Sequence, residues 1–232
     1  MDDASVIAFP AHRRGSLADT LTGFPERPGA TWSARRSERR LTMLVGEVRG
    51  WQPAADRIGL SAADVVLDAS VTAAVEALRA AGGTEIAVSG ELRRPLLTGT
   101  FAGDGHAARA LVAAAAVRDA VDSVHSPEEV HLRACLGIDT GTVIDTRLSG
   151  AIPVAYRAMG TVRMFAVRLQ EFAGPGQVFV SARTVAEIPD ALARFRSIGQ
   201  VRTNPDGETA EAFCLTDLTA TPALRVDSAA GR

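Results

Sequence analysis

The sequence predicts an α+β fold in which helices pack on a mainly antiparallel sheet. Three observations support this: hairpin signals over 85–97 and 197–215, apolar alternation from Val130 to Ile138, and segments of helical spacing between them. Strands that occur both as hairpins and separated by helices favour this class over a doubly wound parallel sheet. We expect the helices to lie on one face of the sheet.

The chain begins with a segment that is typical of a flexible arm. Residues 1–40 mix proline and glycine with scattered charge and show no sustained period. The basic run Arg35 to Arg40 at its end can touch phosphate or an acidic partner, but such a run is more typical of a solvated boundary. The compact apolar run from Leu41 to Val45 predicts the first buried strand.

A helix and a hairpin should follow. Ser61 and Asp64 resemble a capping box, and apolar residues then recur at helical spacing as far as Gly82. Residues 85–97 predict two strands joined by a turn around Gly90.

The next elements are a second helix and a half-buried strand. Apolar residues from Ala110 to Val124 predict the helix, and alternation from Val130 to Ile138 predicts the strand. The tripeptide Asp139–Gly141 has turn chemistry, so we expect the chain to turn there.

The last third of the chain predicts a third helix over 162–172, a short strand over 178–180 and a capped helix that starts at Ser181. A turn at 204–207 should join the strands of the final hairpin, 197–201 and 212–215. We therefore divide the chain into an arm (1–40), one folded domain (41–217) and a C-terminal tail (218–232).

Composition excludes several classes of function. The chain has 232 residues and a net charge of −2, which does not favour a nucleic-acid partner. An acidic N-terminus and the lack of an apolar run of about 20 residues predict a cytoplasmic protein with no membrane span. Cys135 and Cys214 lack metal-type spacing and should be buried free thiols. All 25 basic residues are arginine, and the only asparagine is Asn204.

Taken in order, six stretches resemble the class III adenylate and guanylate cyclase domain, with a ferredoxin-like or palm-type fold. They are 41–51 (LTMLVGEVRGW), 82–84 (GGT), 89–91 (SGE), 136–143 (LGIDTGTV), 156–169 (YRAMGTVRMFAVRL) and 173–181 (AGPGQVFVS). Each stretch alone is weakly specific, but their order makes the resemblance specific.

The resemblance implies positions for two metal ions. In that family two aspartates hold Mg²⁺ or Mn²⁺ on the substrate triphosphate, and the matching positions here are Glu47 and Glu91. Both keep a carboxylate on a side chain longer by one methylene. Two readings remain open: residual metal affinity, or carboxylates with no ligand. We expect no cofactor unless these carboxylates still bind Mg²⁺ or Mn²⁺.

The resemblance also implies positions for nucleotide recognition. A lysine and an aspartate that read the purine correspond to Ala87 and Ala155, and an asparagine that orients the ribose corresponds to Met164. The arginine at the reacting phosphate is retained as Arg168, which either contacts phosphate or pairs with a carboxylate. The alanines and Met164 cannot replace the lost hydrogen bonds.

We therefore expect a non-catalytic cyclase homology domain that acts as a signalling, regulatory or interaction module. Cyclase sites form between two subunits, so a homodimer or heterodimer through the cyclase-type interface is implied, and a further protein partner is open. A homodimer cannot supply lysine, and its only asparagine lies in the C-terminal turn. The alternative is an active or atypical cyclase, as one half of a heterodimer, that makes a 3′,5′-cyclic nucleotide. A third reading, a diguanylate cyclase domain, rests on the Ser89–Leu92 hairpin and conflicts with segment 173–181.

Overall fold

The computed structural model describes residues 33–91, 93–126, 130–149, 154–158, 160–203 and 208–219. Within these ranges the strands are β1 (Ser33–Arg49), β2 (Thr84–Glu91), β3 (Arg94–Ala102), β4 (Arg133–Ser149), β5 (Val154–Ala158), β6 (Val178–Ser181), β7 (Ala193–Arg202) and β8 (Thr209–Leu218). The helices are α2 (Trp51–Ile58), α3 (Leu60–Ala80), α4 (His106–Asp122), α5 (Gly160–Phe172) and α6 (Ala182–Val185).

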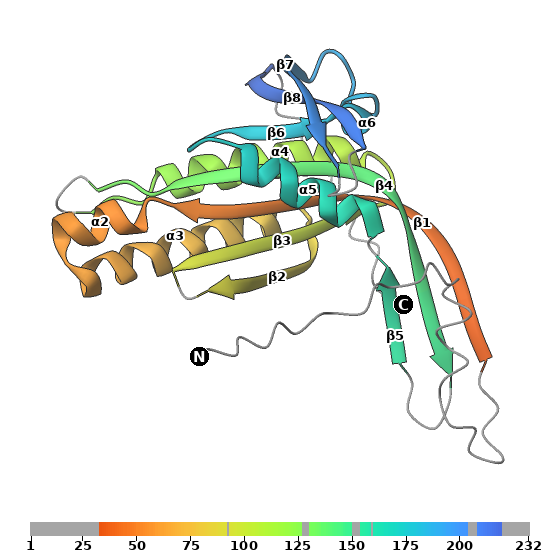
Figure 1. The fold of residues 1–232 in the computed structure, drawn as a ribbon, viewed down its shortest axis with the longest axis horizontal. Helices are drawn as coiled ribbons and strands as arrows, with labels where there is room; N and C mark the ends of the chain where they lie inside the picture. Colours follow the sequence, from red (N-terminus) through yellow and green to blue (C-terminus); the bar gives the residue numbers. More distant parts are fainter. Residues whose placement is uncertain are drawn as a thin grey trace, which may run out of the picture.

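All eight strands join one sheet (Figure 1). Its order is β2-β3-β1-β4-β6-β8-β7, and β5 pairs with β4 outside this path. Every pairing is antiparallel except the parallel pairing of β4 with β6. The predicted α+β class with a mainly antiparallel sheet is therefore confirmed.

The paired strands β1 and β4 are the longest elements of the sheet. Their register runs from Ser33 opposite Ser149 to Arg49 opposite Arg133. Beyond the helices their outer halves bend away together with β5 as a three-stranded extension (Figure 1). The first strand thus begins at Ser33 rather than at Leu41, because residues 33–40, expected in the arm, find pairing partners in β4.

The predicted turn at Asp139–Gly141 is wrong, since β4 continues through these residues as one strand. Asp139 lies opposite Met43 of β1 and is fully buried. Its carboxylate accepts hydrogen bonds from Arg183 of α6, through Nε at 2.6 Å and through Nη2. Asp139 favours a turn when only its neighbours in sequence are considered, but here Arg183, 44 positions away, pairs with its carboxylate within a strand.

The helices cover both faces of the sheet, whereas one face was expected. Leu136 and Ile138 of β4 pack in the core cluster that includes residues of α3 and α4, while Cys135 packs with Leu169 of α5. Because side chains alternate along a strand, α5 lies on the opposite face from α3 and α4, as Figure 1 shows with α5 in front of the sheet and α4 behind it.

Most of the predicted helices and hairpins are confirmed, with two local corrections. The short helix α2 was not predicted, and Gly59 rather than a capping box precedes α3. Asp64 instead accepts a hydrogen bond of 2.8 Å from Trp51 Nε1. At α6 the predicted cap is present, because the Ser181 hydroxyl accepts from the Thr184 N–H.

The remaining predictions concern the cysteines, membrane-spanning helices and the two ends of the chain. Cys135 and Cys214 are buried free thiols, as predicted. Among the described residues, none of the helices combines the length and the apolar character that a membrane span requires. The predicted turn at 204–207, most of the predicted arm (1–32) and nearly all of the predicted tail (220–232) lie outside the described residues.

Candidate functional site

Close packing of α5 on β4 forms one side of the candidate site. An ideal Cβ on Gly137 would lie 2.5 Å from the Gln170 backbone nitrogen, and closer still to the Ala166 carbonyl oxygen. A Cβ on Gly141 would lie 2.6 Å from Val162. The two glycines therefore allow α5 to lie directly on the strand, which places Gln170 beside β1.

Glu47 of β1 lies in this region with both carboxylate oxygens hydrogen bonded. Arg49 Nε and Gln170 Nε2 donate to Oε2 at 2.8 Å and 2.9 Å. Arg94 Nε of β3 donates to Oε1 at 2.8 Å. The Glu47 side chain is 6% exposed, so these three donors replace most of its hydration. We call Glu47, Arg49, Arg94 and Gln170 the Glu47 cluster.

The cluster stabilises the ionised form of Glu47. Burial alone raises the pKa of a carboxyl group, but here the hydrogen bonds from Arg94, Arg49 and Gln170 outweigh it, and the pKa of Glu47 lies below its usual value. Glu47 is therefore a carboxylate at neutral pH.

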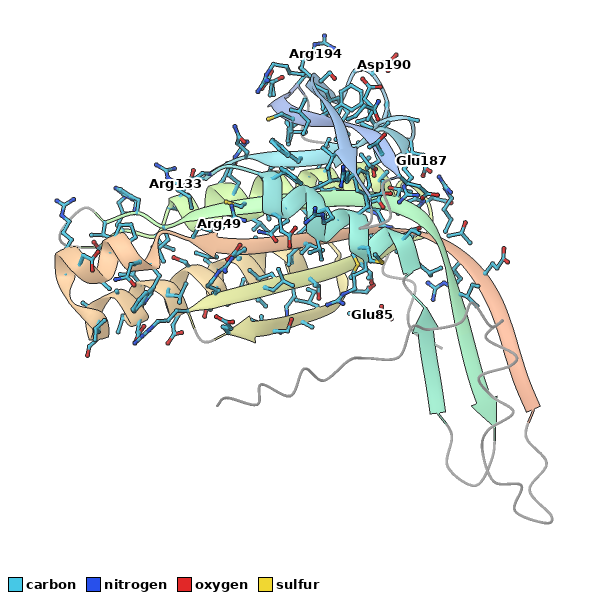
Figure 2. All side chains as sticks on the ribbon, viewed as in Figure 1. Arg49, Glu85, Arg133, Glu187, Asp190 and Arg194 are labelled. Atoms are coloured by element: carbon cyan, nitrogen blue, oxygen red, sulfur yellow. The ribbon has the colours of Figure 1, made fainter. Side chains whose placement is uncertain are left out.

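Arg49 also binds the C-terminal end of α5. Its Nη1 donates to the Ala173 carbonyl at 2.9 Å and its Nη2 to the Gln170 carbonyl at 3.2 Å. A cation at this end of a helix satisfies carbonyls that lack an intrahelical partner and complements the helix dipole. Figure 2 shows Arg49 beside this end of α5. The guanidinium thus connects Glu47 to the helix.

The second carboxylate of the predicted metal pair lies at the end of the β2–β3 hairpin. Glu91 is exposed and lies opposite Arg94 in the strand register. The pKa of Arg94 is raised mainly by its hydrogen bond to Glu47. The negative charges of Glu47, Glu91 and Glu171 add to this effect. The Arg94 guanidinium therefore pairs with Glu47 at one predicted metal position and lies across the hairpin from Glu91 at the other.

The neighbouring Arg93 does not enter the Glu47 cluster. Its guanidinium carbon lies 4.0 Å from the centroid of the Trp51 ring, and its Nε lies 3.5 Å from Asp64. No group of three or more His, Cys, Asp or Glu side chains suited to a metal ion occurs among the described residues.

The predicted nucleotide-binding positions are spread over three elements. Ala87 is exposed on the edge strand β2, where it lies opposite Thr98 at an irregularity in the register. Ala155 of β5 lies opposite Arg147 of β4, on the three-stranded extension. Met164 is 46% exposed on α5.

Arg168 lies one helical turn beyond Met164 and is paired within its own helix. Its Nη1 donates to Glu171 Oε2 at 2.6 Å, and its guanidinium carbon lies 5.5 Å from the Phe172 ring centroid. Arg94 therefore contacts Glu47 directly and lies opposite Glu91 in the strand register, and Met164 and Arg168 lie on one face of α5.

Sequence reasoning missed Arg49 and Gln170 as members of the site. The signal for Arg49 was available, because residues two apart on a strand share a face and Arg49 follows Glu47 at that spacing. Gln170 gave no comparable signal, because its contact with Glu47 depends on the approach of α5 to β4.

The sequence matches no family model and no curated protein, whereas the fold matches solved structures. The adenylyl cyclase CyaB from P. aeruginosa aligns with a TM-score of 0.64 and 17% identity, covering 79% of this chain and 96% of that one. The guanylyl cyclase Cya2 aligns with a TM-score of 0.64 and 18% identity, covering 81% and 96%.

A third solved structure is the guanylate cyclase domain of RhGC from Catenaria anguillulae, which is in complex with GTP. It aligns with a TM-score of 0.60 and 14% identity, covering 78% of this chain and 99% of that one. These matches show that the chain has the fold of the class III nucleotide cyclase catalytic domain.

Proposed function

We propose that this chain is a non-catalytic cyclase homology domain that acts in signalling as a regulatory or interaction module. The observation that supports this most is the hydrogen bonding of Glu47. Both of its oxygens accept from side-chain donors, and two of the three donors are guanidinium groups.

The residues around Glu47 do not fit a divalent cation. A metal ion at this carboxylate would have to share Oε1 with Arg94, and it would lie next to two positive charges. The Arg94 guanidinium already supplies the positive charge that the carboxylates need.

The nucleotide-binding positions give separate support. Ala87 and Ala155 have no side-chain donor or acceptor for a purine, and Met164 has only a weakly accepting thioether. No second copy of this chain can supply a lysine, because the sequence contains none.

The interaction surface that we propose for a second subunit is the exposed side of α5. Met164 and Phe172 are 46% and 57% exposed there, two helical turns apart and on either side of Arg168. Among the structural matches, the guanylyl cyclase domain of RhoGC from Blastocladiella emersonii is described as a non-canonical dimer in one structure and as monomeric in another. The partner here is a second copy of this chain or a related subunit.

The alternative function is an active or atypical nucleotide cyclase, as the metal-side half of a heterodimer. It is favoured by the retained carboxylates Glu47 and Glu91 and by Arg168. A rise in melting temperature with nucleotide, absent in Arg168→Ala, supports this alternative.

The deciding experiment is a cyclase assay of the whole chain with ATP and with GTP, each in Mg²⁺ and in Mn²⁺. We expect no cyclic nucleotide above the level of a no-protein blank. Turnover that persists in Glu76→Ala, an exposed control on α3, but is lost in Glu47→Ala and Glu91→Ala would overturn the proposal.

A further inference from the structure

An arginine, a glutamate and a histidine meet where the three-stranded extension leaves the body of the molecule. The pairing of β1 with β3 begins at Leu41, opposite Ala102, so Arg40 is the adjacent residue of the outer half of β1. Its guanidinium donates to Glu187 Oε1 through Nε at 2.6 Å and through Nη2. The other oxygen of this carboxylate, Oε2, lies 3.3 Å from Nε2 of His106. One carboxylate therefore connects β1 with the start of α4.

The contact joins elements that are far apart in the sequence. Glu187 follows α6, and its backbone N–H donates to the Thr184 carbonyl at 3.0 Å. His106 is the first residue of α4, where Gly105 provides no side-chain cap. Figure 2 shows Glu187 at α6, close to the bend of β4. We call Arg40, His106 and Glu187 the junction cluster.

The hydrogen-bond partners of His106 fit a neutral imidazole. A carboxylate only accepts hydrogen bonds, so Nε2 carries the hydrogen that faces Glu187. In a neutral ring, Nδ1 then accepts from the buried Thr42 hydroxyl, which lies 2.7 Å away. Both ring nitrogens are thus satisfied without a charge, on a side chain that is only 12% exposed.

Protonation of the ring disturbs the hydroxyl groups behind it. Nδ1 would then donate to Thr42, whose own hydrogen would need another acceptor. If Thr42 donates to Thr140, 2.7 Å away, the Thr140 hydrogen loses Thr42 as its acceptor, and Thr184 already donates to Thr140. All three threonines are fully buried, so within these contacts protonation leaves one buried hydroxyl hydrogen without an acceptor.

The surroundings of His106 as a whole also favour the neutral ring. Burial is the largest effect and lowers the pKa of His106. Glu187 opposes it, whereas the cations Arg40 of β1 and Arg109 of α4 lower the pKa further. A positive charge in the first turn of a helix is also opposed by the helix dipole. The folded protein therefore binds this proton less tightly than the unfolded chain.

We propose that the junction cluster is a pH-sensitive clamp: it holds β1 to α4 and α6 while the His106 ring is neutral, and protonation of the ring loosens this contact. Mild acidification therefore loosens the base of the three-stranded extension. The Asp139–Arg183 pair lies on the opposite face of β4 from Thr140 and is not part of the clamp. The clamp is separate from the Glu47 cluster and does not depend on the proposed function.

The first test is an NMR titration of the His106 ring in the whole chain. The wild-type midpoint should lie below about 6.5, the ordinary histidine value. Glu187→Gln removes a negative charge that favours protonation, so proton affinity at His106 should fall further, by up to about fivefold for a partly exposed pair. The matched control Glu76→Gln, exposed on α3, should leave the midpoint unchanged. A wild-type midpoint at or above the ordinary value, or equal midpoints in the two variants, overturns the proposal.

The second test is urea unfolding of the wild type and of His106→Gln, which keeps a donor toward Glu187 but does not titrate. The ratio of the wild-type unfolding constant to that of His106→Gln should rise as the pH falls from about 7.5 to about 5.5, by at most about tenfold per pH unit. The same slope should appear when His131→Gln, a substitution of an exposed histidine, takes the place of the wild type. A wild-type ratio that stays constant with pH overturns the proposal.

Hydrogen exchange in the wild type locates the change. After correction for the intrinsic pH dependence of exchange, the amides of residues 38–42 should lose protection between about pH 7.5 and about pH 5.5, and the amides of β8 should keep theirs. Equal protection of residues 38–42 at the two pH values, or an equal loss in β8, overturns the proposal.

Discussion

A carboxylate at the position of Glu47 can either bind a metal ion or pair with protein side chains. A carboxylate on the first core strand is suited to a metal ion, but here Arg49, Arg94 and Gln170 bind it instead. The side chain is nearly buried, so loss of its charge leaves donors without an acceptor.

Glu47→Gln should therefore destabilise the protein by roughly 1.5–3 kcal/mol, the range for hydrogen bonds to a charged group. Urea unfolding at pH 7 measures this. Glu91→Gln is the matched control, because Glu91 is exposed and its substitution should cost at most about 0.5 kcal/mol. Equal effects of the two substitutions would contradict the role assigned to the Glu47 cluster.

The lowered pKa of Glu47 predicts how the free energy of unfolding changes with pH. The pKa of Glu47 is lowered in the folded state, so the folded protein binds the proton less tightly than the unfolded chain. Its stabilisation is present above about pH 4.3, the ordinary glutamate pKa, and is lost as the pH falls through the lower folded value.

The difference in unfolding free energy between wild type and Glu47→Gln should accordingly shrink as the pH falls from 6 to 3. Urea titrations of both proteins across this range measure the difference. A constant difference would show that Glu47 does not titrate with a lowered pKa.

At this scale the sequence indicated candidate residues but not their partners. Glu47, Glu91 and Arg168 were chosen through the family resemblance and stay predictions as site residues, whereas the contact of Gln170 with Glu47 spans 123 positions of sequence separation. Such contacts depend on how elements pack, which a single sequence does not encode locally.

At the scale of elements, the approach of α5 to β4 depends on Gly137. Any β-carbon there would overlap backbone atoms of the helix, which cannot rotate away as the end of a flexible side chain can. Gly99 of β3 offers a contrast, since a Cβ there would make ordinary contact with Leu78 at 3.5 Å.

Gly137→Ala should therefore destabilise the protein by about 1–3 kcal/mol through overpacking, and α5 should shift outward. Thermal or urea unfolding gives the first quantity, and hydrogen exchange of α5 amides reports the second. Gly99→Ala should be close to neutral. If Gly137→Ala were equally neutral, the close packing described for α5 would be wrong.

Predictions of elements succeeded where the signal was local and failed where a distant residue decided the outcome. The period-two pattern predicted the first half of β4 and helical spacing predicted α4. Asp139 has turn chemistry by itself, but Arg183 and the pairing with β1 hold it in an extended strand. The helix α2 has eight residues, fewer than the window of about 11 or more in which helical spacing is counted.

At the scale of the whole molecule, the sequence predicted the class of fold but not which face of the sheet each helix covers. Hairpin and helix signals implied an antiparallel α+β sheet, yet the placement of α5 on its own face depends on two glycines of β4. That placement leaves the outer side of α5 exposed, with Met164 and Phe172 on it.

An exposed apolar surface of this kind predicts self-association if α5 forms the proposed subunit interface. The double substitution Met164→Ser and Phe172→Ser should shift the assembly toward monomer, with at least about a tenfold weaker association constant in analytical ultracentrifugation. The matched control is Leu60→Ser on α3, since Leu60 is as exposed as Phe172, at 57%. A dimer that survives the double substitution but dissociates in Leu60→Ser would place the interface on the opposite face of the sheet. If the wild type is monomeric at all concentrations, α5 does not bind a second copy of this chain, and its partner is a different protein subunit.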